Sequence, residues 1–425
     1  MVLLGAGASK PAEIPTAFEM TRKMLDAVEQ QGVPHRIRKA VRIAVASLQF
    51  GTGLRDERPT GDVNVEEVVN VLTTLERRHE LEAVPLIGAW HPIVEDLDQI
   101  FLQPNSPRFA NRENADGALN SILRSNRERH VDQIVTALEA ATRGGSFPKS
   151  DLREAITGLF ADANPPLQVR ARPQTVATQQ GREVPGMGKV YANARRFLVN
   201  QLKVLVWRSD TNLDYLKPLV ERAFDERFPI ITLNYDNTIE RTARALGAKL
   251  DSGINYLREN GMMGYGDPNA IPYRKLHGSI HWTLQNENPD SRAPLPREVI
   301  AEASDKEMQD AEYEPALIFG GRNKLTARGP FLDLLLDFRD RLRATNELIV
   351  IGYSFGDDHI NEYIAQWMNT GPQSKLTIIN GPNFAAKATG FAKRLIAVGS
   401  PRVTDTRSYA ETGIATIFDT GGKTP

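Results

Sequence analysis

Three short motifs in this chain bring together residue types that could do chemistry. Residues 5–9 (Gly-Ala-Gly-Ala-Ser) form a glycine-rich turn, whose backbone N–H groups could bind a pyrophosphate at the start of a helix. Residues 232–236 (Thr-Leu-Asn-Tyr-Asp) supply the amide of Asn234, which could orient a ribose or a water molecule. Residues 275–279 (Lys-Leu-His-Gly-Ser) supply His277, which could move a proton near neutral pH. Together the three motifs indicate a pocket for NAD.

Each motif also has a purely structural interpretation when it is taken alone. Lys10 stands where the G-x-G-x-x-G fingerprint has its third glycine, so residues 5–9 also fit a plain turn. Asp236 or Asn237 could cap the helix predicted to follow, and for Asn237 we favour that role. Asn234 lies nearer the end of the preceding apolar run, which favours a role toward a ligand over capping.

Two further motifs follow later apolar runs. In residues 352–358 (Gly-Tyr-Ser-Phe-Gly-Asp-Asp), Ser354 could bind a phosphate or a ribose hydroxyl. Asp357 or Asp358 could instead cap a helix there. Asn380 ends the last strong apolar run and could hold an adenosine ribose, although a plain turn explains it nearly as well.

The composition limits the class of protein. The chain has 425 residues, 41% of them hydrophobic and 25% charged, which is typical of a globular protein of two domains. Its 52 basic and 53 acidic residues give no overall argument for nucleic-acid binding by this chain alone. It has no long apolar run and no signal-like amino terminus, so we expect a cytoplasmic protein with no membrane association. The absence of cysteine excludes disulfides and Cys-based zinc sites, and His277 with His281 lacks further zinc ligands nearby, so no metal is predicted.

The elements that must position these residues form an α/β pattern. Apolar runs predict strands at residues 2–4, 229–233, 316–319, 347–352 and 375–380. Helix periodicity predicts helices at residues 16–28, 237–246, 331–343 and 358–368. Buried strands that alternate with helices indicate a Rossmann-like, doubly wound parallel sheet. Ligands bind beyond the carboxyl ends of such strands, where Gly5, Asn234, Gly352 and Asn380 all lie.

The chain is predicted to contain a large helical insertion. Residues 62–217 are mostly helical in pattern, with an exposed loop at 165–188. We therefore expect one domain from residues 1–61 and 218–425 and a helical insertion domain at 62–217. The polar, acidic stretch at 286–310 is predicted to be a surface excursion.

In this order the motifs resemble the sirtuin-like superfamily, in particular bacterial sirtuin-like proteins of antiphage defence. The resemblance covers roughly residues 1–30 and 225–400 and implies a Rossmann-like sheet that binds NAD as substrate in an extended pose. It implies that Asn234 and His277 are catalytic. The cofactor-binding residues that it implies are Gly5, Ala6, Gly7, Ser9, Pro15, Asp236, Gly352, Ser354 and Asn380.

Two departures separate the chain from protein-deacylating sirtuins. Those enzymes carry a four-cysteine zinc module, and this chain has no cysteine. After the first glycine motif they have Gly-Ile-Pro-Asp-Phe-Arg, of which residues 13–18 (Glu-Ile-Pro-Thr-Ala-Phe) keep only Ile14, Pro15 and a shifted Phe18.

The resemblance to the defence proteins implies an NAD⁺ hydrolase (NADase) that cleaves the nicotinamide glycosidic bond and depletes cellular NAD in abortive infection. Alternatives are an NAD-dependent deacylase, an ADP-ribosyltransferase, or a non-catalytic sensor of NAD or ADP-ribose. The resemblance also implies a homo-oligomer and a HerA-type helicase-like ATPase as a partner, with the helical insertion as the expected interface.

Overall fold

The computed structural model describes residues 1–54, 63–77, 188–287, 297–310, 312–319, 329–388 and 390–419. The chain divides into two compact units, one of Met1–Asp98 with Gly188–Pro425 and one of Gln99–Met187. Only the first contains described residues. The predicted loop at 165–188 lies almost wholly outside them, and the predicted helical insertion is described only at residues 63–77 and 188–217.

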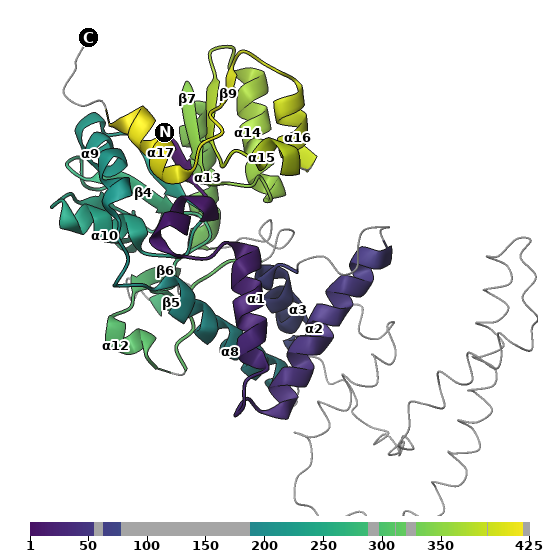
Figure 1. The fold of residues 1–425 in the computed structure, drawn as a ribbon. Helices are drawn as coiled ribbons and strands as arrows, with labels where there is room; N and C mark the ends of the chain where they lie inside the picture. Colours follow the sequence, from purple (N-terminus) through teal and green to yellow (C-terminus); the bar gives the residue numbers. More distant parts are fainter. Residues whose placement is uncertain are drawn as a thin grey trace, which may run out of the picture. The chain divides into compact units, whose positions relative to one another are not determined.

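A seven-stranded parallel sheet forms the centre of the described unit (Figure 1). The strand order is β3-β4-β2-β1-β7-β8-β9. Its strands are β1 (Val2–Leu4), β2 (Ile230–Thr232), β3 (Leu250–Asp251), β4 (Ile271–Lys275), β7 (Glu347–Ile351), β8 (Lys375–Ile379) and β9 (Val403–Asp405). The first strand of the chain is thus the central one, because β1 pairs with β2 on one side and with β7 on the other. The predicted doubly wound parallel sheet is confirmed.

Helices cover both faces of this sheet, and the side-chain alternation of β1 shows why. Leu3 packs into one apolar core with α11 (Ile254–Asn260), α13 (Pro330–Arg343), α14 (Asp358–Thr370) and α16 (Gly390–Ala397). Val2 and Leu4 pack into the opposite core with α9 (Lys217–Glu226), α10 (Thr238–Ala245) and α17 (Ala410–Phe418). A strand that is buried on both faces reads as a continuous apolar run, as these residues do.

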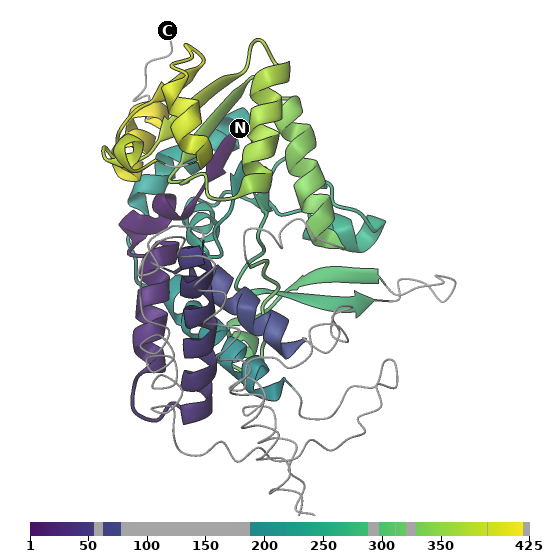
Figure 2. The ribbon, with the colours of Figure 1, turned by 90° about the vertical axis from the view of Figure 1, so that its right-hand side faces the viewer.

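A layer of helices adjoins the sheet domain within the same unit. It consists of α1 (Ala17–Val28), α2 (His35–Leu54), α3 (Val65–Glu76) and α8 (Lys189–Val206), which pack on one another (Figure 2). A capping box begins α1, in which the Glu19 carboxylate accepts hydrogen bonds from the backbone and hydroxyl of Thr16 at 2.9 Å each. None of the described helices is long and apolar enough to cross a membrane.

One sequence prediction is corrected. Residues 316–319 form no strand, since only one isolated bridge joins Leu317 to Gly278. Their backbone instead bonds to a turn, where Ile318 N–H donates to the His277 carbonyl at 3.0 Å. In the predicted surface excursion at 286–310, most of the described residues belong to the antiparallel hairpin of β5 (Trp282–Glu287) and β6 (Arg297–Glu302) and to α12 (Asp305–Met308).

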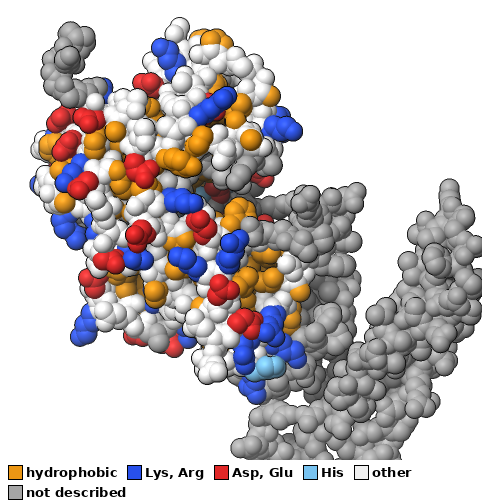
Figure 3. All heavy atoms as spheres, in the orientation of Figure 1, with side chains coloured by type: hydrophobic (Ala, Val, Ile, Leu, Met, Phe, Trp, Pro, Cys, Tyr) orange, Lys and Arg blue, Asp and Glu red, His pale blue; other side chains and the backbone are white. Residues whose placement is uncertain are grey.

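Acidic and basic side chains are interspersed on the face drawn in Figure 3. That pattern agrees with the formal net charge of −1.

Candidate active site

The strands of the sheet end at a common edge, and their pairing continues one residue further. At four successive positions a backbone N–H donates to the carbonyl of the neighbouring strand at 2.9 Å. The row formed in this way contains Gly5, Leu233, Leu276, Gly352 and Asn380. Asn234 and His277 each lie one residue beyond it, on neighbouring strands. The order in which strands are added reverses beside β1, with β2 and β4 on one side and β7, β8 and β9 on the other. Open α/β sheets bind ligands at such a reversal.

The glycine turn after β1 packs against the turn after β7. Gly5 N–H donates to the Ile351 carbonyl at 2.9 Å, and Gly7 N–H donates to the Gly352 carbonyl at 2.8 Å. The backbones are so close that a Cβ added to Gly352 would lie 2.0 Å from Ala8 N. In this structure the N–H groups of Gly5 and Gly7 therefore bond to backbone carbonyls of β7 and its turn. These glycines allow two turns to meet.

Asn234 joins the end of β2 to this glycine turn. Its Nδ2 donates to the Gly5 carbonyl at 2.9 Å and to Ser9 Oγ at 3.0 Å. Both amide hydrogens are used, and this fixes the orientation of the amide. The part of the Asn234 side chain that remains for a ligand is the acceptor Oδ1.

Asp236 and Asn237 both precede α10, and Asn237 was predicted to cap it. Asp236 Oδ1 accepts hydrogen bonds from Thr238 N at 3.0 Å and from Thr238 Oγ1 at 2.7 Å. Asn237 occupies the N-cap position but makes no capping bond with its side chain, and its buried Oδ1 accepts none from the described residues. Asp236 therefore caps the helix, and the role assigned to Asn237 is wrong.

His277 lies on a tight turn directly after β4. It is 3% exposed, and Gly278 beside it has a φ of +83°, where a Cβ would lie 2.0 Å from the Ala316 carbonyl oxygen. Its Nε2 lies 4.0 Å from Asp357 Oδ1, and its ring centroid lies 5.9 Å from that of His359. The turn is thus fixed by packing, and it places the histidine against the start of α14.

Asp357 and His359 were not predicted as site residues. Asp357 was considered only as a helix cap, and its side chain makes no capping bond to α14. The sequence offered one signal, since Asp357 lies within the motif that contains Ser354 after β7 and His359 directly follows that motif.

The remaining predicted residues lie around the same edge. Ser354 is exposed on the turn after β7. Asn380 is buried, and its Nδ2 donates to the Tyr353 carbonyl at 2.8 Å. Ala6 and buried Ser9 lie in the glycine turn, and buried Pro15 lies between that turn and α1.

Below the site, a buried lysine supports the loop that carries Asn234. Lys275 Nζ donates to Glu240 Oε1 at 2.8 Å and to the Asp236 carbonyl. The Tyr273 hydroxyl donates to Glu240 Oε2 at 3.1 Å. Burial, assisted by the charge of Glu240, raises the pKa of Tyr273 well above 10, so this phenol stays protonated.

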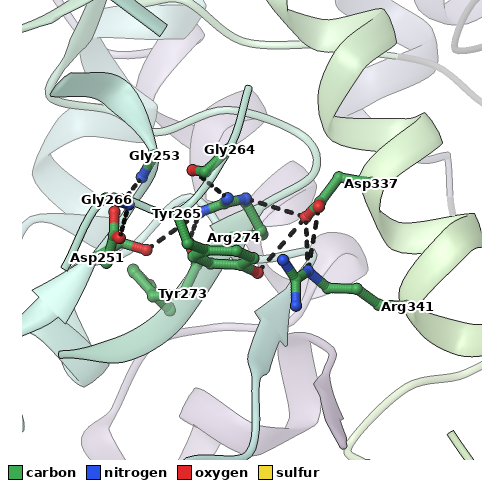
Figure 4. Close-up of polar contacts among 9 residues, drawn as sticks. All are labelled: Asp251, Gly253, Gly264, Tyr265, Gly266, Tyr273, Arg274, Asp337 and Arg341. Atoms are coloured by element: carbon green, nitrogen blue, oxygen red, sulfur yellow. Dashed lines mark hydrogen bonds and ion pairs between the residues drawn. The ribbon is translucent and has the colours of Figure 1, made fainter. Parts of the chain in front are cut away.

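A second buried cation lies on the opposite face of β4. Figure 4 shows the Tyr265 ring beside the guanidinium groups of Arg274 and Arg341, at 3.5 and 3.6 Å from the ring centroid. Arg274 donates to Asp337 Oδ2 at 3.1 Å and to the Gly264 carbonyl at 2.7 Å. This cluster anchors the loop before β4 to α13, and the Asp337 carboxylate pairs with both guanidinium groups.

Within the ranges given above, no group of three or more His, Cys, Asp or Glu residues could hold a metal ion. His281 instead has its Nδ1 2.9 Å from Ser279 Oγ and its Nε2 3.8 Å from Glu302 Oε1.

Comparison with known proteins agrees with this architecture. The fold defines a Rossmann-like α/β protein with its site at the carboxyl edge of a parallel sheet. Residues 229–395 match the family model of the SIR2-like domain, and the match supports a sirtuin-like relationship for this part of the chain. That span contains Asn234, His277, Gly352, Ser354 and Asn380. SIR2-like domains are typically NAD-dependent enzymes, so the match indicates an NAD-related activity. No curated protein matches the chain.

Proposed function

We propose that this protein is an NADase, which hydrolyses NAD⁺ to nicotinamide and ADP-ribose. The observation that carries the proposal is the placement of Asn234 and His277 at matching positions beyond two paired strands. One contributes a fixed acceptor and the other an imidazole, at the edge where nucleotides bind in such sheets.

Cleavage of the nicotinamide bond passes through an oxocarbenium-like centre on the ribose, as in glycoside hydrolysis. Asn234 Oδ1 accepts a hydrogen bond from a ribose hydroxyl or from the attacking water. His277 takes the proton that the ribose hydroxyl or the water molecule releases, an effect worth roughly 10²–10⁴-fold in rate. The exposed hydroxyl of Ser354 lies on the adjoining turn and extends the binding surface.

Water suits this chain better than an acyl-lysine as the molecule that receives the ADP-ribosyl group. The sequence has no cysteine, so it cannot build the four-cysteine zinc module of protein-deacylating sirtuins. Transfer to a protein side chain stays the alternative within the same chemistry.

The proposal includes control of the activity. A constantly active NADase would deplete the NAD of its own cell. We therefore propose that a homo-oligomer and a HerA-type ATPase partner control the activity. The enzyme would act in the cytoplasm, in antiphage defence by abortive infection. The helical insertion at residues 62–217 is the proposed interface, and the resemblance of the motifs to defence proteins supports these points.

The test is incubation of the purified protein with NAD, alone and with an ATPase encoded beside it. Nicotinamide and ADP-ribose are quantified by chromatography for the wild type, for His277→Ala, and for His35→Ala as a control at the exposed start of α2. We expect both products from the wild type and the control and none from His277→Ala. An acyl-ADP-ribose product with an acetyl-lysine peptide would indicate a deacylase, and NAD binding without release would indicate a sensor.

A further inference from the structure

We infer that Asp357 is a positioning residue for His277, a carboxylate that orients the imidazole and makes it a stronger base. The inference rests on the proposed function, because it assigns a partner to the proposed base. Its first support is geometric. Asp357 Oδ1 lies 4.0 Å from His277 Nε2, with side-chain exposures of 15% and 3%. Pairs of groups that hydrogen-bond during catalysis are often long or poorly aligned without substrate and tighten when it binds.

The loop that carries Asp357 is fixed by its own hydrogen bonds. Asp357 N–H donates to the Tyr353 hydroxyl at 3.0 Å. The Tyr353 hydroxyl lies 3.2 Å from Asn361 Oδ1, and Asn361 Nδ2 donates to the Phe355 carbonyl at 2.8 Å.

Phe355 in this loop has a φ of +59°, a conformation that a bulky residue rarely adopts. Such strain persists only where the surroundings impose it, and it concentrates at functional sites. The carboxylate is therefore held in one place by a strained and well-bonded loop.

His277 is a basic neighbour of Asp357, and the charge of this carboxylate also acts on two tyrosines. Burial raises the pKa of Tyr235 and of Tyr353 well above 10, and the charge of Asp357 adds to this effect in both. Both phenols therefore stay neutral. Asp358 adds a further negative charge near Tyr353, and Glu66 adds one near Tyr235. His359 faces the His277 ring from α14.

The proton inventory follows from this arrangement. When Nε2–H points at the carboxylate, the tautomer of His277 has its lone pair on Nδ1. In the reaction an O–H bond of the ribose or of water breaks, an N–H bond forms at Nδ1, and the Asp357 carboxylate stays ionised and stabilises the imidazolium.

The test compares Asp357→Asn with Asp358→Asn, a matched loss of one charge at the neighbouring exposed position. We expect Asp357→Asn to lower kcat for nicotinamide release by roughly 10–100-fold with little change in KM. The acid limb of its pH profile should move to lower pH, because an imidazole without its anionic partner is a weaker base. Asp358→Asn should retain the wild-type profile, and Asp357→Glu should recover part of kcat.

A second readout does not depend on turnover. The chain has seven histidines, and loss of one ¹⁵N resonance in His277→Ala identifies the signal of His277. Its titration midpoint should lie at lower pH in Asp357→Asn than in the wild type.

An unchanged midpoint, or a profile of Asp357→Asn equal to that of Asp358→Asn, would overturn the inference and leave the proposed function intact. Full activity of His277→Ala would instead overturn the proposed mechanism itself.

Discussion

The Tyr235 hydroxyl donates a hydrogen bond of 2.8 Å to Glu66 Oε1, in the first turn of α3. It also lies 3.0 Å from the Ile318 carbonyl oxygen. Tyr235 directly follows Asn234, so this contact joins the helical layer to the loop that carries the proposed catalytic amide. A partner that binds at α3 would therefore act on the loop of Asn234 through the contact between Glu66 and Tyr235.

Replacing Tyr235 by Phe tests this link. We expect the free energy of unfolding to fall by roughly 1–2 kcal/mol, because Glu66 and a carbonyl lose a donor. Tyr409→Phe is the matched control, since its ring is 60% exposed and no hydrogen bond of its hydroxyl is seen within the described residues. Urea unfolding measures both. Equal stabilities of the two variants would show that the contact contributes nothing.

Gly352→Ala should be far more damaging than an alanine at another left-handed glycine. Gly352 has a φ of +66° and no room for a Cβ, whereas Gly399 has a φ of +60° and open space around it. Gly399→Ala should cost about 1–2 kcal/mol, the usual cost of a left-handed conformation. Gly352→Ala should cost roughly 3–5 kcal/mol, because two turns must separate. Denaturant unfolding of both variants gives the difference, and similar values would contradict the close packing.

Lys275 and Glu240 should be strongly coupled. Lys275→Met leaves the partly buried Glu240 carboxylate without its cation, which should cost roughly 3–5 kcal/mol. Adding Glu240→Gln should recover part of that loss. A double-mutant cycle measured by urea unfolding reports the coupling. Additive losses would mean that the two charges act independently.

Asn234→Asp should disable the site through one atom. The substitution places an oxygen where Nδ2 now donates to the Gly5 carbonyl, so two acceptors face each other. We expect a loss of roughly 1–3 kcal/mol in stability and a fall of more than about 100-fold in nicotinamide release. Asn260→Asp is the control, because its amide donates to the Tyr256 carbonyl from an exposed position at the end of α11. Equal turnover in the two variants would exclude Asn234 from catalysis.

The capping box of α1 should give stability that depends on pH. The backbone hydrogen bond from Thr16, assisted by Lys10, lowers the pKa of Glu19 from 4.5 to about 2. A lowered pKa in the folded state means that the stabilisation is present above pH 4.5 and is lost as pH falls toward 2. The stability difference between the wild type and Glu19→Gln should therefore shrink across that window. Unfolding curves at several pH values measure it, and a constant difference would contradict the assignment.

The sequence predicts the sheet well where a strand is a continuous apolar run, as in β7 and β8. It missed β4, because Arg274 and Lys275 interrupt the apolar pattern there. Those cations are buried and form ion pairs with Asp337 and Glu240, which lie far away in the chain. Local periodicity cannot reveal such partners. The run at 316–319 misled for the opposite reason, since it is apolar but its backbone bonds to the turn at His277 instead of joining a sheet.

The site was predictable only as a set of strand ends. Topology alone brings Asn234 and His277 to one edge, because parallel strands end together. The hydrogen bonds of Gly5 and Gly7 depend on how closely the turn after β7 approaches them. The spacing of residues in the sequence does not predict the distance between the two turns. The position of Asp357 likewise depends on a strained loop.

The central position of β1 has a consequence for the order of folding. Its pairing partners lie far along the chain from residues 2–4, at Ile230–Thr232 in β2 and at Ile349–Ile351 in β7. Until both partners have joined β1, the central strand lacks a neighbour and the two glycine turns cannot meet. Contacts of such long sequence separation form slowly, so the edge that carries Asn234 and His277 depends on pairings that local structure alone cannot supply.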